Sequence, residues 1–307
     1  MRPTSRLPRA HSEVPRIGLL LAGDRSYPSY AAFLEGLRVL GYVEGQTIDL
    51  EVRFGEGRHE RLPGLAAELV ALRPDVLAVI GAVTFFAARQ VAAAIPLVFA
   101  IVLDPVEAGL IGDAERPGGT VTGSTSFDPD QTARQVQLLR QTVPELSRIA
   151  ILSDAGVPKL LAEQARAVAA RAGLQSSVRL LDGPDDVAPA IAAFRHEGAG
   201  GLLVLEVPRT STYGRRIAQL AHEAQLPTMF GRDLARVGPM LAYGTSFAAA
   251  TQRMAGLVDR VLQGERPGEL PVERVIEPGL VVNLKVARDL GVKIPPEVLA
   301  QATLVIE

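Results

Sequence analysis

The stretch RIGLLLAG at residues 16–23 decides the fold, because a short apolar run that ends in turn residues is typical of a buried parallel strand. The same form returns as RIAILSDAG at residues 148–156. Each copy leads into a helical pattern that ends at a glycine, and then into a strand pattern of alternating residues. The chain therefore repeats its own secondary structure.

The repeat continues through the rest of both halves. A third strand is predicted at residues 75–81 and again at 201–207, and the junction AIPLVF at 94–99 matches QLPTMF at 225–230. The offset is roughly 130 residues. Short strands that alternate with helices indicate βαβ units, parallel sheets and helices on both sheet faces. We expect an α/β protein with two doubly wound parallel-sheet lobes joined by a hinge; one doubly wound protein with an ordinary βα rhythm is the alternative.

Gly, Ser and Thr mark where the chain crosses between lobes. They are frequent at residues 117–127, and a second crossing is expected near 243–246. The tail then runs through an expected strand at 274–283 into a short helix. The lobe boundaries follow from these features. We expect a disordered tail at 1–14, a first lobe of 15–125 with 246–275, and a second lobe of 126–245 with 276–307.

Composition excludes several functions. The chain has 307 residues, a net charge of −2 and no cysteine, so disulfides, thiol catalysis and a strongly basic nucleic-acid surface are not expected. The four histidines lack metal-site spacing, and no phosphate-binding, dinucleotide-binding or serine-nucleophile motif occurs. We therefore predict a protein that is not an enzyme, with no metal and no cofactor.

The candidate site lies on loops that follow the predicted strands. Ligands of open parallel sheets bind at the carboxyl ends of the strands, and two facing lobes would place two such edges on one cleft. The candidate ligand-binding residues are Ser26, Tyr27, Ala82, Thr84, Phe85, Asp104, Ser124, Thr125, Asp154, Arg209, Asp233 and Tyr243. Hydroxyls and helix N-termini suit a carboxylate, the acidic groups suit an ammonium, and the aromatic rings suit an apolar group.

Each candidate also has a purely structural interpretation. Ser26 and Thr84 are equally typical of helix N-caps, and Asp104 and Asp154 of turns. Phe85 suits a hydrophobic core. Arg209 could form ion pairs instead of contacting a ligand.

The chain resembles the ABC-transporter substrate-binding proteins that include the tryptophan- and tyrosine-binding lipoproteins. The matching stretches are FLEGLRVLGYVEG (33–45), RLPGLAAELVALRPD (61–75), IPLVF (95–99) with DPVEAGL (104–110), RPGGTVTG (116–123), LLRQTVPELSRIA (138–150) and LVVNLKVARDLGVKIPP (280–296). The resemblance implies a type I periplasmic-binding fold, no catalysis, and delivery of an aromatic amino acid or a related aromatic or aliphatic acid to a membrane permease. We expect a monomer.

Two departures from the family pattern stand out. The loop that often reads Gly-Thr-Pro is here Gly81-Ala82-Val83, with the threonine at Thr84, so the ligand carboxylate contact could differ. No export signal or lipid-bearing cysteine is visible, although the resemblance implies a periplasmic or membrane-associated protein. A cytosolic ligand sensor with the same cleft is therefore one alternative, and an enzyme with Asp104 or Asp233 as its base is a second.

Overall fold

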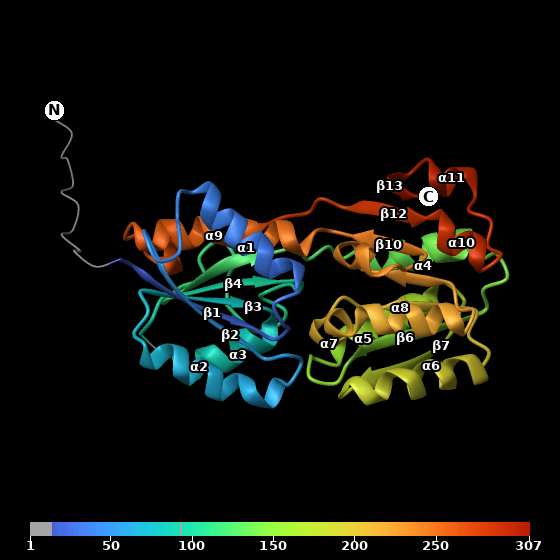
Figure 1. Cartoon of the computed structure of the whole chain (residues 1–307), viewed down its shortest axis with the longest axis horizontal. Helices are drawn as coiled ribbons and strands as arrows, with labels where there is room; N and C mark the ends of the chain where they lie inside the picture. Colours follow the sequence, from blue (N-terminus) through green and yellow to red (C-terminus); the bar gives the residue numbers. More distant parts are fainter. Residues whose placement is uncertain (1–13, 93) are drawn as a thin grey trace.

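Two parallel-rich sheets, each in its own lobe, make up the protein. The computed structural model describes residues 14–92 and 94–307, so the predicted tail at 1–14 lies, except for Val14, outside the described residues. The two lobes lie side by side along the long axis (Figure 1). The predicted fold class of two doubly wound lobes is confirmed.

The first lobe is built on a six-stranded sheet in the order β11-β5-β4-β3-β1-β2, with every pair parallel. Its strands are β1 (Arg16–Leu21), β2 (Asp49–Phe54), β3 (Val76–Ile80), β4 (Leu97–Ile101), β5 (Val121–Thr125) and β11 (Glu273–Arg274). Its helices are α1 (Pro28–Val39), α2 (Leu62–Ala71), α3 (Ala82–Arg89) and α9 (Phe247–Leu262).

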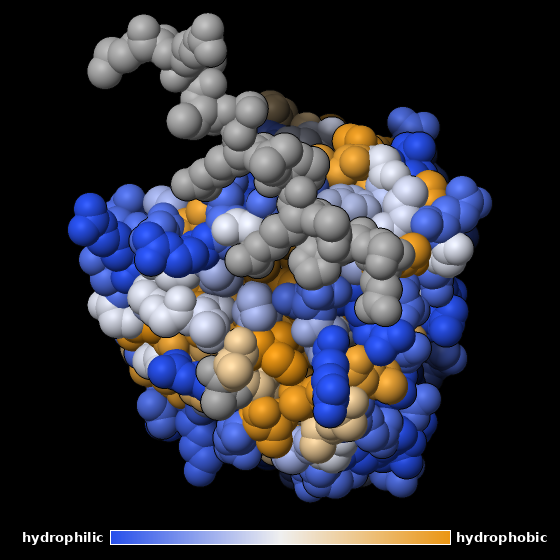
Figure 2. Space-filling view, turned by 90° about the vertical axis from the view of Figure 1, so that its left-hand side faces the viewer, coloured by the Kyte–Doolittle hydropathy of each residue, from blue (hydrophilic) through white to orange (hydrophobic). Residues whose placement is uncertain are grey.

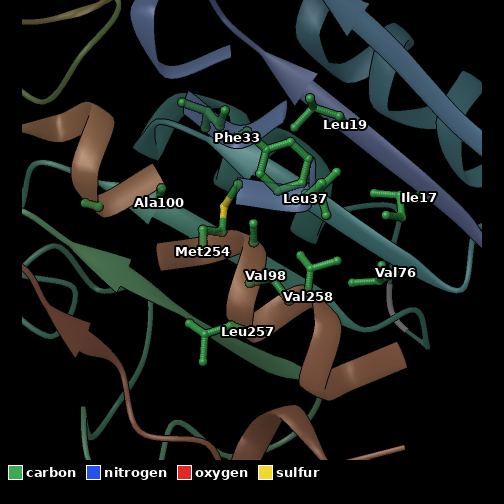
Figure 3. Close-up of a cluster of buried hydrophobic side chains, with 14 of the residues drawn as sticks. Ile17, Leu19, Phe33, Leu37, Val76, Val98, Ala100, Met254, Leu257 and Val258 are labelled. Carbon is green, nitrogen blue, oxygen red and sulfur yellow. The ribbon is translucent and has the colours of Figure 1, made fainter. Parts of the chain in front are cut away.

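Alternation along β1 explains why its apolar run is unbroken. Ile17, Leu19 and Leu21 join the core under α1 and α9, whereas Leu20 joins the core under α2 and α3. Figure 3 shows Phe33 of α1 near this first core, together with side chains from α9 and from the strands. A sheet buried on both faces needs apolar residues at every position.

The second lobe has a seven-stranded sheet in the order β13-β12-β10-β9-β8-β6-β7, in which only the β10–β12 pair is antiparallel. Its strands are β6 (Arg148–Asp154), β7 (Gln175–Leu181), β8 (Gly201–Val204), β9 (Thr228–Phe230), β10 (Leu241–Gly244), β12 (Gly279–Asn283) and β13 (Ala302–Ile306). Its helices are α4 (Gln131–Thr142), α5 (Leu160–Arg171), α6 (Val187–His196), α7 (Pro208–Thr212), α8 (Gly214–Glu223), α10 (Leu284–Asp289) and α11 (Pro296–Leu299).

The tail differs from its prediction. Residues 274–283 were expected to form one strand, but β11 belongs to the first sheet and β12 to the second. Pro278 lies between them and has no N–H to donate to a strand partner, so the ladder cannot continue through it. The segment between β11 and β12 therefore crosses from one lobe to the other.

Hydrogen bonds tie two of the crossings together. The Thr245 hydroxyl, between β10 and α9, donates to the carbonyl oxygen of Ser126, which follows β5. The Thr245 N–H also donates to the Gln131 side chain across 2.9 Å. These contacts hold the connecting segments in register where a hinge would lie.

The outer surface is mixed in character. Figure 2 looks at the end of the first lobe, where hydrophilic side chains surround scattered apolar ones. Among the described residues, no helix is both long enough and apolar enough to cross a membrane.

Candidate functional site

A small, partly open cavity lies between the lobes, at the carboxyl ends of parallel strands from both sheets. The first lobe contributes loops after β1, β3 and β4, and the second contributes loops after β6 and β8. The lining residues are Tyr27, Ile80, Gly81, Ala82, Val83, Val102, Leu103, Val157, Pro158, Leu161, Glu206, Val207, Pro208 and Phe247. We call this space the inner cavity; its walls are mostly apolar.

A larger cavity of about 330 Å³ adjoins the inner one. Both are lined by Val102, Leu161, Glu206, Val207 and Phe247. This second space, the outer cavity, extends along the hinge and between α4 and α5, and polar side chains line much of it. Glu206 thus lies where an apolar space meets a polar one.

Among the described residues, Glu206 is the only carboxylic acid that lines the inner cavity. Burial, reinforced by the nearby charge of Asp233, raises the pKa of Glu206 well above its usual range, although a backbone N–H of Asp233 and the Arg236 guanidinium oppose this. A Cβ added at Gly231 would lie 1.8 Å from Glu206 Oε2, so a glycine at 231 makes room for the carboxyl group. Within residues 14–92 and 94–307, Glu206 has no ion-pair partner.

Two aromatic rings close one wall of the inner cavity. The Tyr27 and Phe247 rings lie with centroids 6.3 Å apart and planes tilted by 59°. Both side chains are buried, and burial, the largest cause, raises the pKa of the Tyr27 phenol. These rings offer an apolar surface beside the single carboxyl group.

Two predicted residues, Tyr27 and Ala82, line the inner cavity. Four others serve the first lobe itself. The Thr84 hydroxyl donates to Gly81, and Phe85 is fully buried against Phe99. The remaining two hydroxyls, of Ser124 and Thr125, donate to the carbonyl oxygens of Ala250 and Leu103.

Three more predicted residues lie outside both cavities. The Ser26 hydroxyl donates to the Asp24 carboxylate, and that serine is exposed. Asp104 accepts hydrogen bonds from the N–H groups of the turn that follows it. Tyr243 is half-buried in β10, and its carbonyl oxygen accepts from Gln135.

Asp154, Arg209 and Asp233 form contacts between structural segments. Arg209 Nη1 lies 3.1 Å from Asp154 Oδ1, and both side chains are buried. Asp233 accepts from the Ser246 hydroxyl and from the N–H of Ala248 at the start of α9. Burial, as the largest cause, raises the pKa of Asp233 while these hydrogen bonds oppose the shift.

The two cavities together combine an apolar space with the Glu206 carboxyl group, and the outer one adds the charged side chains of Glu107, Asp128 and Arg171. Within the described part of the chain, no group of three or more His, Asp or Glu side chains is arranged to hold a metal ion. The family model for ABC transporter substrate binding proteins matches residues 16–306.

The chain belongs to this family.

Two solved structures share the fold of this family member. A conserved domain protein from Vibrio cholerae is 25% identical, covers 95% of this chain and 100% of its own, and gives a TM-score of 0.87. A domain from Streptococcus pneumonia, solved in complex with L-Trp, is 24% identical, with coverages of 96% and 100% and a TM-score of 0.86. A curated tyrosine-binding protein from Clostridioides difficile is 22% identical over 258 residues, which are 82% of this chain and 73% of the relative.

The sequence analysis of this substrate-binding protein missed Glu206 and Phe247. Glu206 follows β8 by two residues, but the run GLLVLEV was interpreted as one strand to residue 207, whereas β8 ends at Val204. A lone acidic residue near the end of an apolar strand was the available signal. Phe247 directly follows the crossing expected near 243–246, and nothing local showed that its side chain would lie at the cleft.

Proposed function

We propose that this protein is the solute-binding component of an ABC importer and that it binds an α-amino acid with an apolar or aromatic side chain between its lobes. The observation that carries the proposal is the unpaired carboxyl group of Glu206 in the cavity wall. Glu206 is only partly exposed, and a carboxylate largely withdrawn from water without a cationic partner is costly, so a ligand ammonium would supply the missing charge. The raised pKa expresses the same cost.

The ligand carboxylate has a natural partner on the opposite lobe. Ala82 and Val83 line the inner cavity and form the first turn of α3. The N–H groups of a first helical turn have no partner within the helix, and the helix dipole favours an anion there. An ammonium on Glu206 and a carboxylate on α3 would join the two lobes through one zwitterion.

The cavity walls favour an apolar side chain. Tyr27, Leu161 and Phe247 form apolar surface near the proposed charge contacts. The tyrosine-binding relative and the L-Trp complex support an aromatic amino acid as the first choice. We infer that the protein works outside the cytoplasm, as a monomer, with a membrane permease as its partner.

Calorimetric titration with the twenty standard amino acids tests the proposal. We expect at least one apolar or aromatic amino acid to bind, and the matching amine-free acid to bind far more weakly. Glu206→Gln should weaken binding by about 30-fold or more, because losing one partner of a buried charge pair costs about 2–5 kcal/mol. If Glu206→Gln binds as tightly as the wild type, or if no amino acid binds, the proposal is wrong.

A further inference from the structure

The outer cavity holds a pair of glutamine side chains one helical turn apart. Gln131 and Gln135 stand at positions i and i+4 of α4, so they lie on the same face of that helix, and both line the cavity. Each has one end of its amide fixed by the protein. The other end of each amide, which has no partner among the described residues, is available to hydrogen-bond a ligand in the cavity.

The amide of Gln135 is oriented by two carbonyl oxygens. Its Nε2 donates to Tyr243 across 2.7 Å and to Phe230 across 3.4 Å, which engages both of its N–H groups. The residue is only 3% exposed. Its Oε1 accepts no hydrogen bond from the described residues and is not itself a buried atom, so an acceptor of fixed direction is left accessible at the cavity.

The amide of Gln131 is oriented the opposite way. Its Oε1 accepts from the N–H and the hydroxyl of Thr245, at 2.9 and 3.2 Å. Its Nε2 therefore stays available as a donor, and it has no acceptor in residues 14–92 and 94–307. The cavity thus offers one fixed donor and one fixed acceptor from neighbouring turns.

Resting on the proposed function, we propose that Gln131 and Gln135 are a specificity site for a hydroxyl group at the far end of the ligand side chain. A hydroxyl donates one hydrogen bond and accepts others, so it can satisfy both glutamines at once. Phe127, Leu161 and Phe247 add apolar wall to the same cavity, which Glu206 also lines. A phenol on an aromatic amino acid combines the ammonium, the ring and the hydroxyl.

The glutamine pair would discriminate between two ligands of nearly equal shape. L-Phenylalanine lacks only the hydroxyl, so on filling the cavity it would cut the Gln135 acceptor and the Gln131 donor off from water without giving either a partner. Sites that hydrogen-bond a ligand hydroxyl reject the analogue without it. We expect the wild-type protein to prefer L-tyrosine over L-phenylalanine by about tenfold or more.

Gln131→Leu is the decisive variant. It removes the free donor and adds no acceptor, so the ligand hydroxyl loses one partner and the ratio of the L-tyrosine and L-phenylalanine affinities should fall. The lost Thr245 contacts affect both ligands alike, so the ratio cancels their effect. Gln137→Leu is the matched control, because Gln137 lies on the same helix but is exposed and accepts only from Arg134.

Isothermal titration of both ligands to wild type, Gln131→Leu and Gln137→Leu gives distinct outcomes. A preference in wild type and Gln137→Leu that is reduced in Gln131→Leu supports the inference. No preference in the wild type, or an unchanged ratio in Gln131→Leu, overturns it while amino-acid binding through Glu206 stands. If neither ligand binds and no other amino acid does, the proposed function itself is wrong and this inference falls with it.

Discussion

The Nε of Arg209 in the second lobe donates to the carbonyl oxygen of Gly57 in the first across 3.0 Å. The same guanidinium pairs with Asp154 and donates to the carbonyl oxygen of Leu181 within its own lobe. Arg209 is only 5% exposed. Arg209 therefore connects segments within the second lobe and also binds that lobe to the loop after β2 in the first lobe.

Arg209→Lys should loosen the closed arrangement of the lobes. Lysine keeps a charge beside Asp154, but it lacks the planar fork that reaches Asp154 and Gly57 together. Because closure slows ligand escape, we expect the dissociation rate of the ligand to rise by about tenfold, measured by stopped flow. Arg179→Lys, which changes an ion pair within the second lobe, should leave that rate unaltered. Equal rates in all three proteins would contradict the role of Arg209.

His59 adds a pH-sensitive contact between the lobes. Its Nε2 lies 3.5 Å from Asp154 Oδ2, and its ring packs on Gly156, where an added Cβ would lie 1.8 Å from Nδ1. Burial, the largest cause, and the Arg209 charge lower the pKa of His59, while Asp154, a Gly156 backbone contact and Glu60 oppose them. The arrangement with this contact between the lobes, which we call the closed form, therefore favours a neutral ring.

Acidification should open the lobes through His59. A lowered pKa in the closed form means that closure is unaffected well above the ordinary histidine pKa of about 6.5. As the pH falls below that value, the open form takes up a proton that the closed form resists, so the closed population declines. Small-angle scattering should show the radius of gyration increasing from pH 7 toward pH 5. In His59→Gln this increase should shrink, and an identical pH profile would refute the assignment.

Ligand affinity should respond to pH through Glu206 as well. Burial raises the pKa of Glu206 in the empty cleft, and a bound ammonium would lower it again. Affinity should thus be greatest above the raised pKa and decline as the pH falls through it, because protons then compete with the ligand. The decline should begin at a higher pH than an ordinary glutamate would give. Titrations of His59→Gln isolate this effect, and Glu206→Gln should abolish it.

Gly231→Ala displaces the Glu206 carboxyl group without removing it. The new Cβ would lie 1.8 Å from Glu206 Oε2, and the backbone at Gly231 is extended with φ −64°, so alanine causes no backbone strain. We expect ligand affinity to fall by about tenfold or more, as the ammonium contact is misplaced. Gly183→Ala is the control, because its Cβ would meet no atom within 4 Å. Calorimetry that finds both variants equal to wild type would show that Gly231 does not position Glu206.

The sequence predicted the fold well because the evidence for it is local. The run at residues 16–23 contains both the strand and its burial on two faces, and the strand-end rule placed Tyr27 and Ala82 at the cavity. The other candidates were decided by partners distant in sequence. Asp154 meets Arg209 across 55 residues, and Ser124 meets Ala250 across 126. No periodicity encodes such pairs, so hydroxyls and charges near strand ends could not be divided into ligand contacts and structural ones.

The packing of α1 on α9 gives a test of the fold that is independent of the ligand. These helices make close contact, and a Cβ added at Gly36 would lie 2.7 Å from the Ala255 Cβ and 2.8 Å from the Gln252 carbonyl oxygen. Gly36→Ala should therefore force the helices apart and lower the free energy of unfolding by about 1–3 kcal/mol, the usual cost of overpacking.

At Gly256, on α9 itself, we expect alanine to have the opposite effect on the free energy of unfolding. A Cβ there would meet no atom within 4 Å, and Gly256 lies in the interior of the helix. Gly256→Ala should raise the free energy of unfolding by about 0.5–1 kcal/mol, because alanine loses less backbone freedom on folding than glycine does. Urea unfolding followed by circular dichroism measures both variants. Two changes of the same sign would mean that close approach of α1 and α9 does not determine the effect of Gly36.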